Sequence, residues 1–142
     1  MNISIIIPVH NEQENISKLL ADVVKLNSSL KNFEIIVVDD NSSDKTGQIA
    51  HNYSKKYKNI RVVHRSKGIN GMGAALKEGT KAAKGKYVVW VMGDNSDDLT
   101  MIPIFIEKLK NNYDVVFGSR YMKGGSRGDL GVLKAMLGVC YT

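Results

Sequence analysis

The chain has 142 residues, of which 43% are hydrophobic, and it carries a formal net charge of +6. That length suits one domain with its own hydrophobic core and argues against two, while the positive charge suits polyanionic partners such as phosphates. The single cysteine, Cys140, excludes an intramolecular disulfide framework and a cysteine-based metal site, and it fits a reducing, intracellular setting.

The first half of the chain alternates short apolar runs with segments of helical periodicity. Ile3–Val9 is rich in β-branched residues, which is typical of a strand buried on both faces. Apolar residues then recur at helical spacing over 16–26. A second strand is predicted over 33–38, a second helix beginning near 43–44, and a third strand at Ile60–His64.

The second half continues the alternation. A helix rich in alanine is predicted over 74–84 and a strand over 86–92. Apolar residues at i, i+3, i+4 and i+7 predict a further helix over 102–109. A fifth strand is predicted over 114–117, and the glycine-rich, basic stretch 118–131 is interpreted as a loop.

Strands that alternate with helices at these lengths predict right-handed crossovers and an α/β fold, with a mostly parallel sheet and helices on both faces. We expect one such domain over 1–142. Ligands in sheets of this kind bind beyond the carboxyl ends of the strands. Because the polar segments 8–12, 39–44 and 94–98 all follow predicted strands, they are expected to converge on one edge of the sheet.

Two acids, Asp39 and Asp40, stand at the end of the second predicted strand. A carboxylate there can accept hydrogen bonds from a ribose hydroxyl or from a base N–H. The structural alternative is that the acids of this segment cap the next helix and order the turn. His10 is a further candidate, because it neighbours Asn11 and Glu12 at another predicted strand end.

The apolar run that ends at Met92 gives way to three carboxylates, Asp94, Asp97 and Asp98. Mg²⁺ and Mn²⁺ prefer carboxylate oxygens and keep waters or substrate phosphates in their remaining positions, so one or two acids are enough. Asp94, directly at the predicted strand end, is the leading candidate for a metal ligand. Asp97 and Asp98 suit equally well an acidic turn that caps the following helix.

Glycines and late basic residues give two weaker signals for phosphate binding. Gly68, Gly71 and Gly73 have the order G-x-x-G-x-G, which matches neither the dinucleotide-binding motif nor the Walker motif. They permit either a tight turn or a close approach of backbone to a nucleotide. Arg120, in the late basic loop, either binds phosphate or belongs to a solvated surface.

Five segments of the chain match a known set of motifs in the right order: 5–12, 37–44, 70–79, 92–94 and 118–125. Jointly they are far more specific than any one of them. The set resembles family 2 glycosyltransferases of the GT-A fold. Within that family the set most resembles the dolichol-phosphate mannosyltransferase and polyprenyl-phosphate sugar transferase group.

The resemblance implies roles for individual residues. It implies that Asp94 and Arg120 are catalytic, that Asp94 binds a metal bridging the donor's diphosphate, and that Arg120 contacts phosphate. The residues implied to surround the nucleotide are Pro8, His10, Asn11, Glu12, Val38, Asp39, Asp40, Gly71 and Gly93. The chain departs from the family at Met92, where the first acid of the usual D-x-D motif is absent, and Asp97 is the second metal ligand that could compensate.

The implied activity is an inverting transfer of a hexose from a GDP- or UDP-linked sugar, assisted by Mg²⁺ or Mn²⁺. A hydroxyl acceptor, as on a saccharide, needs a general base. The candidates for that base beyond Asp98 are Asp114, expected to be buried at the start of a strand, and Asp129. A polyprenyl or dolichyl phosphate needs none, because its oxygen is already anionic, so this acceptor is favoured.

A module that binds the nucleotide sugar without turnover is the alternative function. The missing acid at Met92 favours it, as does the family's usual continuation well past Thr142, which we expect to supply acceptor-binding helices. Nucleic-acid binding is not expected, because the chain has neither a basic helix nor an aromatic stacking platform.

The sequence also bears on location. No apolar run approaches the roughly 18 residues needed to cross a membrane, and the first residues lack the pattern of a signal peptide. We therefore expect a cytoplasmic protein, with peripheral association at the cytoplasmic face of a membrane as the setting for a polyprenyl acceptor.

Overall fold

The structure is a computed structural model that describes residues 2–66, 68 and 71–119. Within these residues four strands alternate with four α-helices, and two short 3₁₀ helices are interposed. The elements are β1 (Ile3–Val9), α1 (Ile16–Lys25), η1 (Leu26–Ser28), β2 (Phe33–Asp39), α2 (Thr46–Lys56), β3 (Ile60–His64), α3 (Met72–Ala82), β4 (Tyr87–Trp90), η2 (Leu99–Met101) and α4 (Ile102–Lys110). The predicted alternation of strands and helices is confirmed.

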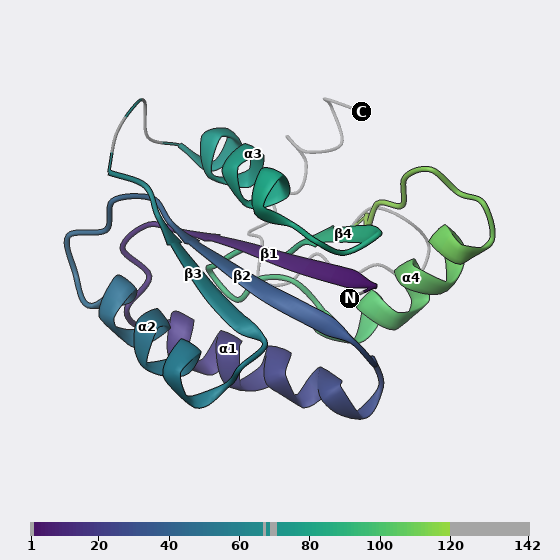
Figure 1. Ribbon diagram of the computed structural model, residues 1–142, viewed down its shortest axis with the longest axis horizontal. Helices are drawn as coiled ribbons and strands as arrows, with labels where there is room; N and C mark the ends of the chain where they lie inside the picture. The colour runs from purple at the N-terminus through teal and green to yellow at the C-terminus, as the bar shows by residue number, and fades with distance from the viewer. Residues whose placement is uncertain (1, 67, 69–70, 120–142) are drawn as a thin grey trace, which may run out of the picture.

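The described strands are all parallel and lie in the order β3-β2-β1-β4. The central pair is in register from Ile3 opposite Phe33 to Val9 opposite Asp39. Figure 1 shows α1 and α2 together on one face of the sheet and α3 alone across the other. The predicted parallel sheet with helices on both faces is therefore confirmed.

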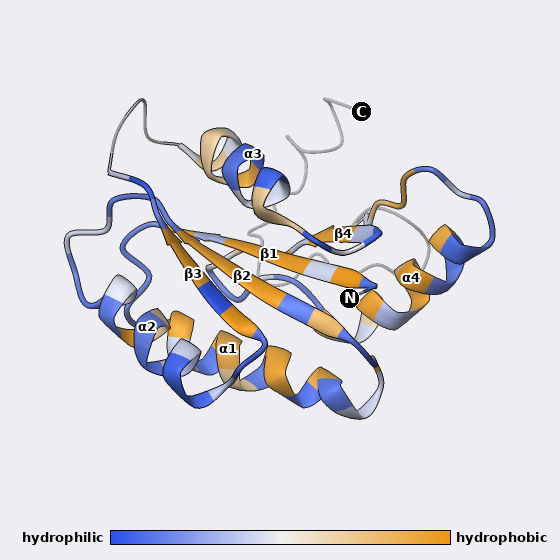
Figure 2. Cartoon of the chain, in the orientation of Figure 1, coloured by the Kyte–Doolittle hydropathy of each residue, from blue (hydrophilic) through white to orange (hydrophobic). Residues whose placement is uncertain are grey.

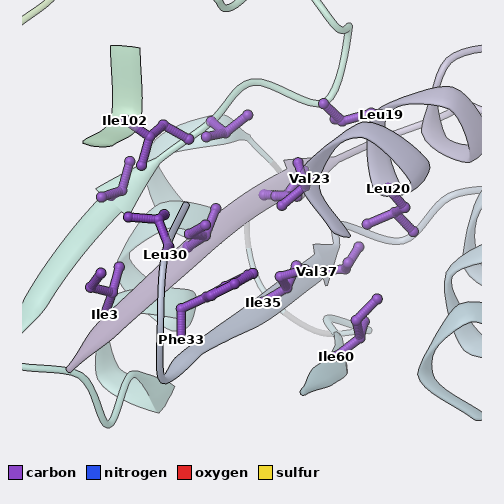
Figure 3. Close-up of a cluster of buried hydrophobic side chains, with 14 of the residues drawn as sticks. Ile3, Leu19, Leu20, Val23, Leu30, Phe33, Ile35, Val37, Ile60 and Ile102 are labelled. Atoms are coloured by element: carbon purple, nitrogen blue, oxygen red, sulfur yellow. The ribbon is translucent and has the colours of Figure 1, made fainter. Parts of the chain in front are cut away.

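The larger hydrophobic core lies between the sheet and the face covered by α1 and α2. Successive side chains of a strand point to opposite faces, so Ile5 and Ile7 belong to this core while Ile6 packs beneath α3. Figure 3 shows Leu20 of α1 directed toward Val37 of β2. Figure 2 shows the apolar strands above α1 and α2, whose outer faces are hydrophilic. These segments fold as helices here because their apolar faces pack against the sheet.

The fifth strand predicted over 114–117 is wrong. The segment is irregular, and its apolar side chains are exposed, Val115 by 62% and Phe117 by 82%. In the described part of the chain β4 pairs only with β1, and no strand lies beside 114–117. Backbone N–H and C=O groups form a strand only with a neighbour to pair with. Asp114, expected to be buried, is exposed as well.

Other predicted boundaries shift by one or two residues. The third helix begins at Met72 rather than at residue 74, and the fourth strand is shorter than 86–92, although the Val91 amide still donates to the Ile6 carbonyl over 3.0 Å.

Among the described residues, none of the helices combines the length and apolar character required to cross a membrane.

The buried carboxylate of Glu34 lies away from the carboxyl edge of the sheet, in a polar cluster with Ser4, Arg61 and the backbone amide of Lys84. Glu34 is 2% exposed and accepts hydrogen bonds from the Ser4 hydroxyl (2.7 Å) and the Lys84 amide (2.8 Å). The Arg61 guanidinium lies 3.1 Å from the same carboxylate. Burial alone would raise the pKa of Glu34, but these hydrogen bonds lower it below its ordinary value. The cluster ties three strands to the turn before β4.

Candidate functional site

The sheet changes its winding direction between β1 and β4. The crossovers from β1 to β2 and from β2 to β3 use α1 and α2 on one face, whereas the crossover from β3 to β4 uses α3 on the other. Open α/β sheets bind ligands beyond the carboxyl ends of the strands at such a switch point. The candidate site is therefore the carboxyl edge of the sheet around the end of β1, as predicted.

The loops after β1 and β2 are joined by hydrogen bonds between side chains and backbone. The Asn11 amide donates to the Ser42 hydroxyl over 3.0 Å, and the Asn11 side-chain oxygen accepts from the Ser43 amide over 2.8 Å. The Glu12 amide donates to the Thr46 hydroxyl over 2.7 Å. Two of the predicted nucleotide-binding residues, Asn11 and Glu12, are therefore held in place by the loop that follows the first acidic pair.

Asp44 orders the start of α2. Its carboxylate accepts hydrogen bonds from the Thr46 amide (2.9 Å) and from the Gln13 amide (3.1 Å). Burial alone would raise the pKa of Asp44, but hydrogen bonds from the Thr46 hydroxyl, the Thr46 amide and the Gln13 amide lower it below its ordinary value. Among the acids after β2, it is therefore Asp44 that orders the turn before the helix; it lies one residue before the N-cap Lys45.

Asp39 ends β2 and is only 6% exposed. Its Oδ1 accepts the Ser42 amide over 3.1 Å, and its Oδ2 lies 3.0 Å from Nδ1 of His64. A buried carboxylate is tolerated only with such partners. The neighbouring Val38 side chain packs in the core beneath α3 and is fully buried, so only its backbone could approach a nucleotide.

Asp40 is 4% exposed and forms an ion pair with Arg65, which follows β3. Its Oδ2 accepts the Gly71 amide over 2.5 Å, so the carboxylate also holds the residue at the N-cap of α3. Nδ1 of His10 lies 2.8 Å from the Asp40 carbonyl oxygen. These contacts account for the burial of Asp40 without a ligand; its nucleotide-binding role stays a prediction.

The acidic turn over 94–98 packs against the end of β1 through Gly93. A Cβ atom on Gly93 would lie 2.6 Å from the Pro8 carbonyl oxygen, so only glycine permits this approach. Beyond it Asp94 is exposed, and its Oδ1 accepts the Ser96 amide over 3.0 Å. The predicted metal ligand and the end of β1 thus adjoin.

The other two acids of the turn have different partners. Asp97 is exposed, and its Oδ2 accepts the Met92 amide over 2.7 Å, so the carboxylate folds back to the residue that replaces the first acid of D-x-D. Asp98 is the N-cap of η2 and accepts hydrogen bonds from the hydroxyl and amide of Thr100, which lower its pKa below the ordinary value. The capping role predicted for Asp98 is confirmed.

Within the described ranges no group of three or more histidine, cysteine or acidic side chains could hold a metal ion. A divalent cation that shares its coordination with substrate phosphates needs only one or two carboxylates. The exposed oxygens of Asp94 and Asp97 therefore suit Mg²⁺ or Mn²⁺ by their chemistry. Arg120 lies outside the described residues.

Three residues at this edge were not predicted from the sequence: Gly47, His64 and Arg65. The signal was available in part, because His64 and Arg65 end the third predicted strand just as Asp39 and Asp40 end the second. Parallel register places these two pairs side by side, with Asp39 opposite His64. Gly47 carried no such signal, since its contact depends on how α2 packs on the sheet.

A family model described as glycosyl transferase family 2 matches residues 4–137. The chain belongs to this family. One curated relative of this family 2 glycosyltransferase is the dolichol-phosphate mannosyltransferase of Pyrococcus furiosus, 40% identical over 125 residues that cover 88% of the chain and 35% of the relative. Another is the poly(ribitol-phosphate) beta-glucosyltransferase of Bacillus spizizenii, 40% identical over 95 residues, 67% of the chain and 15% of the relative. The family 2 chain thus spans about a third or less of these relatives.

Solved structures of other glycosyltransferases share the fold of this family 2 chain. TarS of S. aureus, in complex with UDP-GlcNAc, aligns with a TM-score of 0.65 at 28% identity, covering 87% of the chain and 39% of TarS. A mannosyltransferase of Pyrobaculum calidifontis, in complex with GDP-Man and Mn²⁺, aligns with a TM-score of 0.59 at 23% identity over 66% of the chain and 27% of that protein. The predicted GT-A fold is confirmed.

Proposed function

We propose that this chain is the donor-binding part of an enzyme that transfers a hexose from a GDP- or UDP-linked sugar to an acceptor. One observation carries the proposal: the close contact of Gly93 with Pro8 brings the exposed acids of the turn over 94–98 to the end of β1, beside the buried Asp39 on β2. Groups suited to a nucleoside and groups suited to a diphosphate therefore adjoin at the switch point of the sheet.

The nucleoside would lie at the ends of β1 and β2. Asp39 has one hydrogen-bond partner on each carboxylate oxygen, and each oxygen can accept a second bond, from a base N–H or a ribose hydroxyl. Asn11 and Glu12 border this position on a loop that is already ordered by the loop after β2. Two structurally similar glycosyltransferases were solved in complex with UDP-GlcNAc and with GDP-Man, which supports a nucleotide sugar as donor.

Asp94 and Asp97 would hold a divalent metal. The Asp97 carboxylate is placed against the Met92 amide, where the family's motif has its first acid, so Asp97 is suited to replace that acid. A bound Mg²⁺ or Mn²⁺ supplies positive charge to the diphosphate that departs. Arg120 would add a second positive charge to the same group.

In the proposed reaction an acceptor oxygen attacks the anomeric carbon of the hexose from the side opposite the diphosphate. The new C–O bond forms as the bond to the diphosphate breaks, and the nucleoside diphosphate leaves with the electron pair, which inverts the anomeric centre. We propose a polyprenyl phosphate as the acceptor, because its anionic oxygen needs no base. Of the two candidate bases, Asp114 is exposed instead of buried as expected, and Asp129 lies outside the described residues. The name of the Pyrococcus relative supports this class of acceptor.

Nucleotide titration tests the donor site. We expect GDP or UDP to bind, and to bind more tightly with Mn²⁺ than without it. Asp94→Asn removes the charge of an exposed acid, so it should remove the gain from Mn²⁺ while the free energy of unfolding changes by less than about 0.5 kcal/mol. Asp98→Asn, in the same turn, is the matched control and should keep the gain. Failure of both nucleotides to bind would overturn the proposal.

Transfer assays separate the enzyme from a module that binds a nucleotide sugar without turnover. The absence of an acid at residue 92 is the observation that favours the module. Radiolabelled sugar should move to a polyprenyl phosphate in vesicles when the chain is present. The chain should also sediment with those vesicles, as peripheral association with the cytoplasmic face of a membrane requires. Binding of the donor without transfer to a polyprenyl phosphate or a saccharide would favour the module.

A further inference from the structure

We propose that His64 is a positioning residue for donor recognition, which holds the Asp39 carboxylate in the orientation that accepts the nucleoside, and that Gly47 leaves the space this arrangement needs. The inference rests on the proposed function, since it concerns how Asp39 meets a nucleotide. It adds two residues, one on β3 and one on α2, that the family's motifs in this chain do not include.

The first observation is the pairing of Asp39 with His64. The two residues are opposite each other at the ends of β2 and β3, with Nδ1 of His64 3.0 Å from Oδ2 of Asp39. An ionised carboxylate only accepts, so the ring N–H is the donor. The Asp39 side chain is 8% exposed and the His64 side chain 55%, so a buried carboxylate is paired with a largely exposed ring.

The second observation is the steric role of Gly47 in the first turn of α2. A Cβ atom at this position would lie 2.5 Å from Oδ2 of Asp39 and 3.3 Å from Cε1 of His64. Gly47 has no left-handed backbone angle that would require glycine, and glycine is a poor helix former. Clearance for the Asp39 and His64 side chains is therefore the physical reason for glycine here.

Together these contacts leave the Asp39 carboxylate little freedom. The Ser42 amide holds Oδ1 over 3.1 Å, His64 holds Oδ2, and α2 closes the space behind Oδ2. Both oxygens keep one lone pair for a ligand. A carboxylate oriented in advance binds a nucleoside without the cost of ordering its own side chain on binding.

The experiment compares two substitutions of His64 by calorimetric titration with GDP and with UDP in the presence of Mn²⁺. His64→Val suits a strand but cannot donate, so affinity for the nucleotide that binds should fall about tenfold. His64→Asn keeps an N–H near the position of Nδ1 and should stay within about twofold of the unchanged chain. Urea unfolding should show similar stability for both variants.

Gly47→Ala tests the same carboxylate without touching His64. Alanine favours the helix, yet its Cβ displaces Oδ2, so the nucleotide affinity should fall about tenfold while the helix itself is not weakened. In an Asp39→Ala background the same substitution should have no effect on affinity, because the displaced group is gone. Gln48→Ala, at an exposed neighbouring position of α2, is the control and should bind as the unchanged chain does.

The possible outcomes distinguish this inference from the proposed function. If the unchanged chain binds neither GDP nor UDP, both are overturned. If the unchanged chain binds a nucleotide and the variants at residues 47 and 64 bind it with the same affinity, donor binding stands and the positioning role is overturned. Equal weakening by His64→Val and His64→Asn at unchanged stability would also overturn it, because the ring rather than its N–H would then be what matters.

Discussion

The two acidic segments at the carboxyl edge of the sheet are held in opposite ways. Asp39 and Asp40 are buried, and each contacts a basic side chain at the end of β3, His64 or Arg65. The acids of the turn over 94–98 are exposed and accept hydrogen bonds from amides close by in the sequence, those of Met92, Ser96 and Thr100. The first segment is therefore part of the folded framework, whereas the second is a surface turn.

This difference predicts how much each acid contributes to stability: a buried acid contributes more than an exposed one. Removing a buried carboxylate takes away an ion-pair partner and a hydrogen-bond acceptor that the fold holds in place, which is costly. An exposed carboxylate is solvated already, so its loss changes stability little. The comparison predicts that substitutions at Asp40 lower stability, while those at Asp94 and Asp97 lower metal-dependent binding with the fold intact.

The largest effect is expected for Asp40→Ala. The substitution leaves the Arg65 guanidinium, whose side chain is 12% exposed, and the Gly71 amide without this acceptor. We expect the free energy of unfolding in urea to fall by about 3 kcal/mol. Asp94→Ala is the control and should change it by less than about 0.5 kcal/mol. Similar losses for the two variants would abolish the distinction between the segments.

A smaller effect is expected for Glu34→Gln, which tests a buried acid far from the candidate site. Glutamine keeps an acceptor oxygen but loses the charge that pairs with Arg61, so stability at pH 7 should fall by about 2 kcal/mol. The folded-state pKa of Glu34 lies below its ordinary value near 4.5, so its ionised form stabilises the fold above that value. This contribution is lost as the pH falls through the folded-state pKa.

Urea unfolding at pH 7 and at about pH 3 measures this linkage. The difference in stability between the unchanged chain and Glu34→Gln should shrink at the lower pH. Nucleotide affinity at pH 7 should be the same in both, because Glu34 is not at the carboxyl edge. A constant difference at the two pH values would contradict the assigned cause of the lowered pKa.

The smallest change in stability is expected for Asp97→Asn. Asparagine keeps an oxygen to accept the Met92 amide, so the free energy of unfolding should change by less than about 0.5 kcal/mol. If Asp97 replaces the missing acid of D-x-D, the gain in nucleotide affinity from Mn²⁺ should fall about tenfold, less than for Asp94→Asn. If Asp97→Asn left the gain in nucleotide affinity from Mn²⁺ unchanged, the only role of Asp97 would be to close the turn.

Much of the fold could be predicted because its signals are local. The β-branched run Ile3–Val9 and the helical spacing of Ile16, Leu19 and Val23 predicted elements that the structure contains. The prediction failed over 114–117, where the composition was right for a strand but no strand of the described residues lies beside it. Strand pairing is a property of two segments, so one segment's composition cannot decide it.

The candidate site was predictable to a similar extent. The sequence by itself determined that acids follow the ends of two predicted strands, and the motif set assigned the chain to its family. Only the tertiary structure decided that Asp39 pairs with His64 and Asp40 with Arg65, and that Gly47 makes room for the first pair. The physical reason is distance along the chain: these partners are 25 residues apart and meet only through the parallel register of β2 and β3.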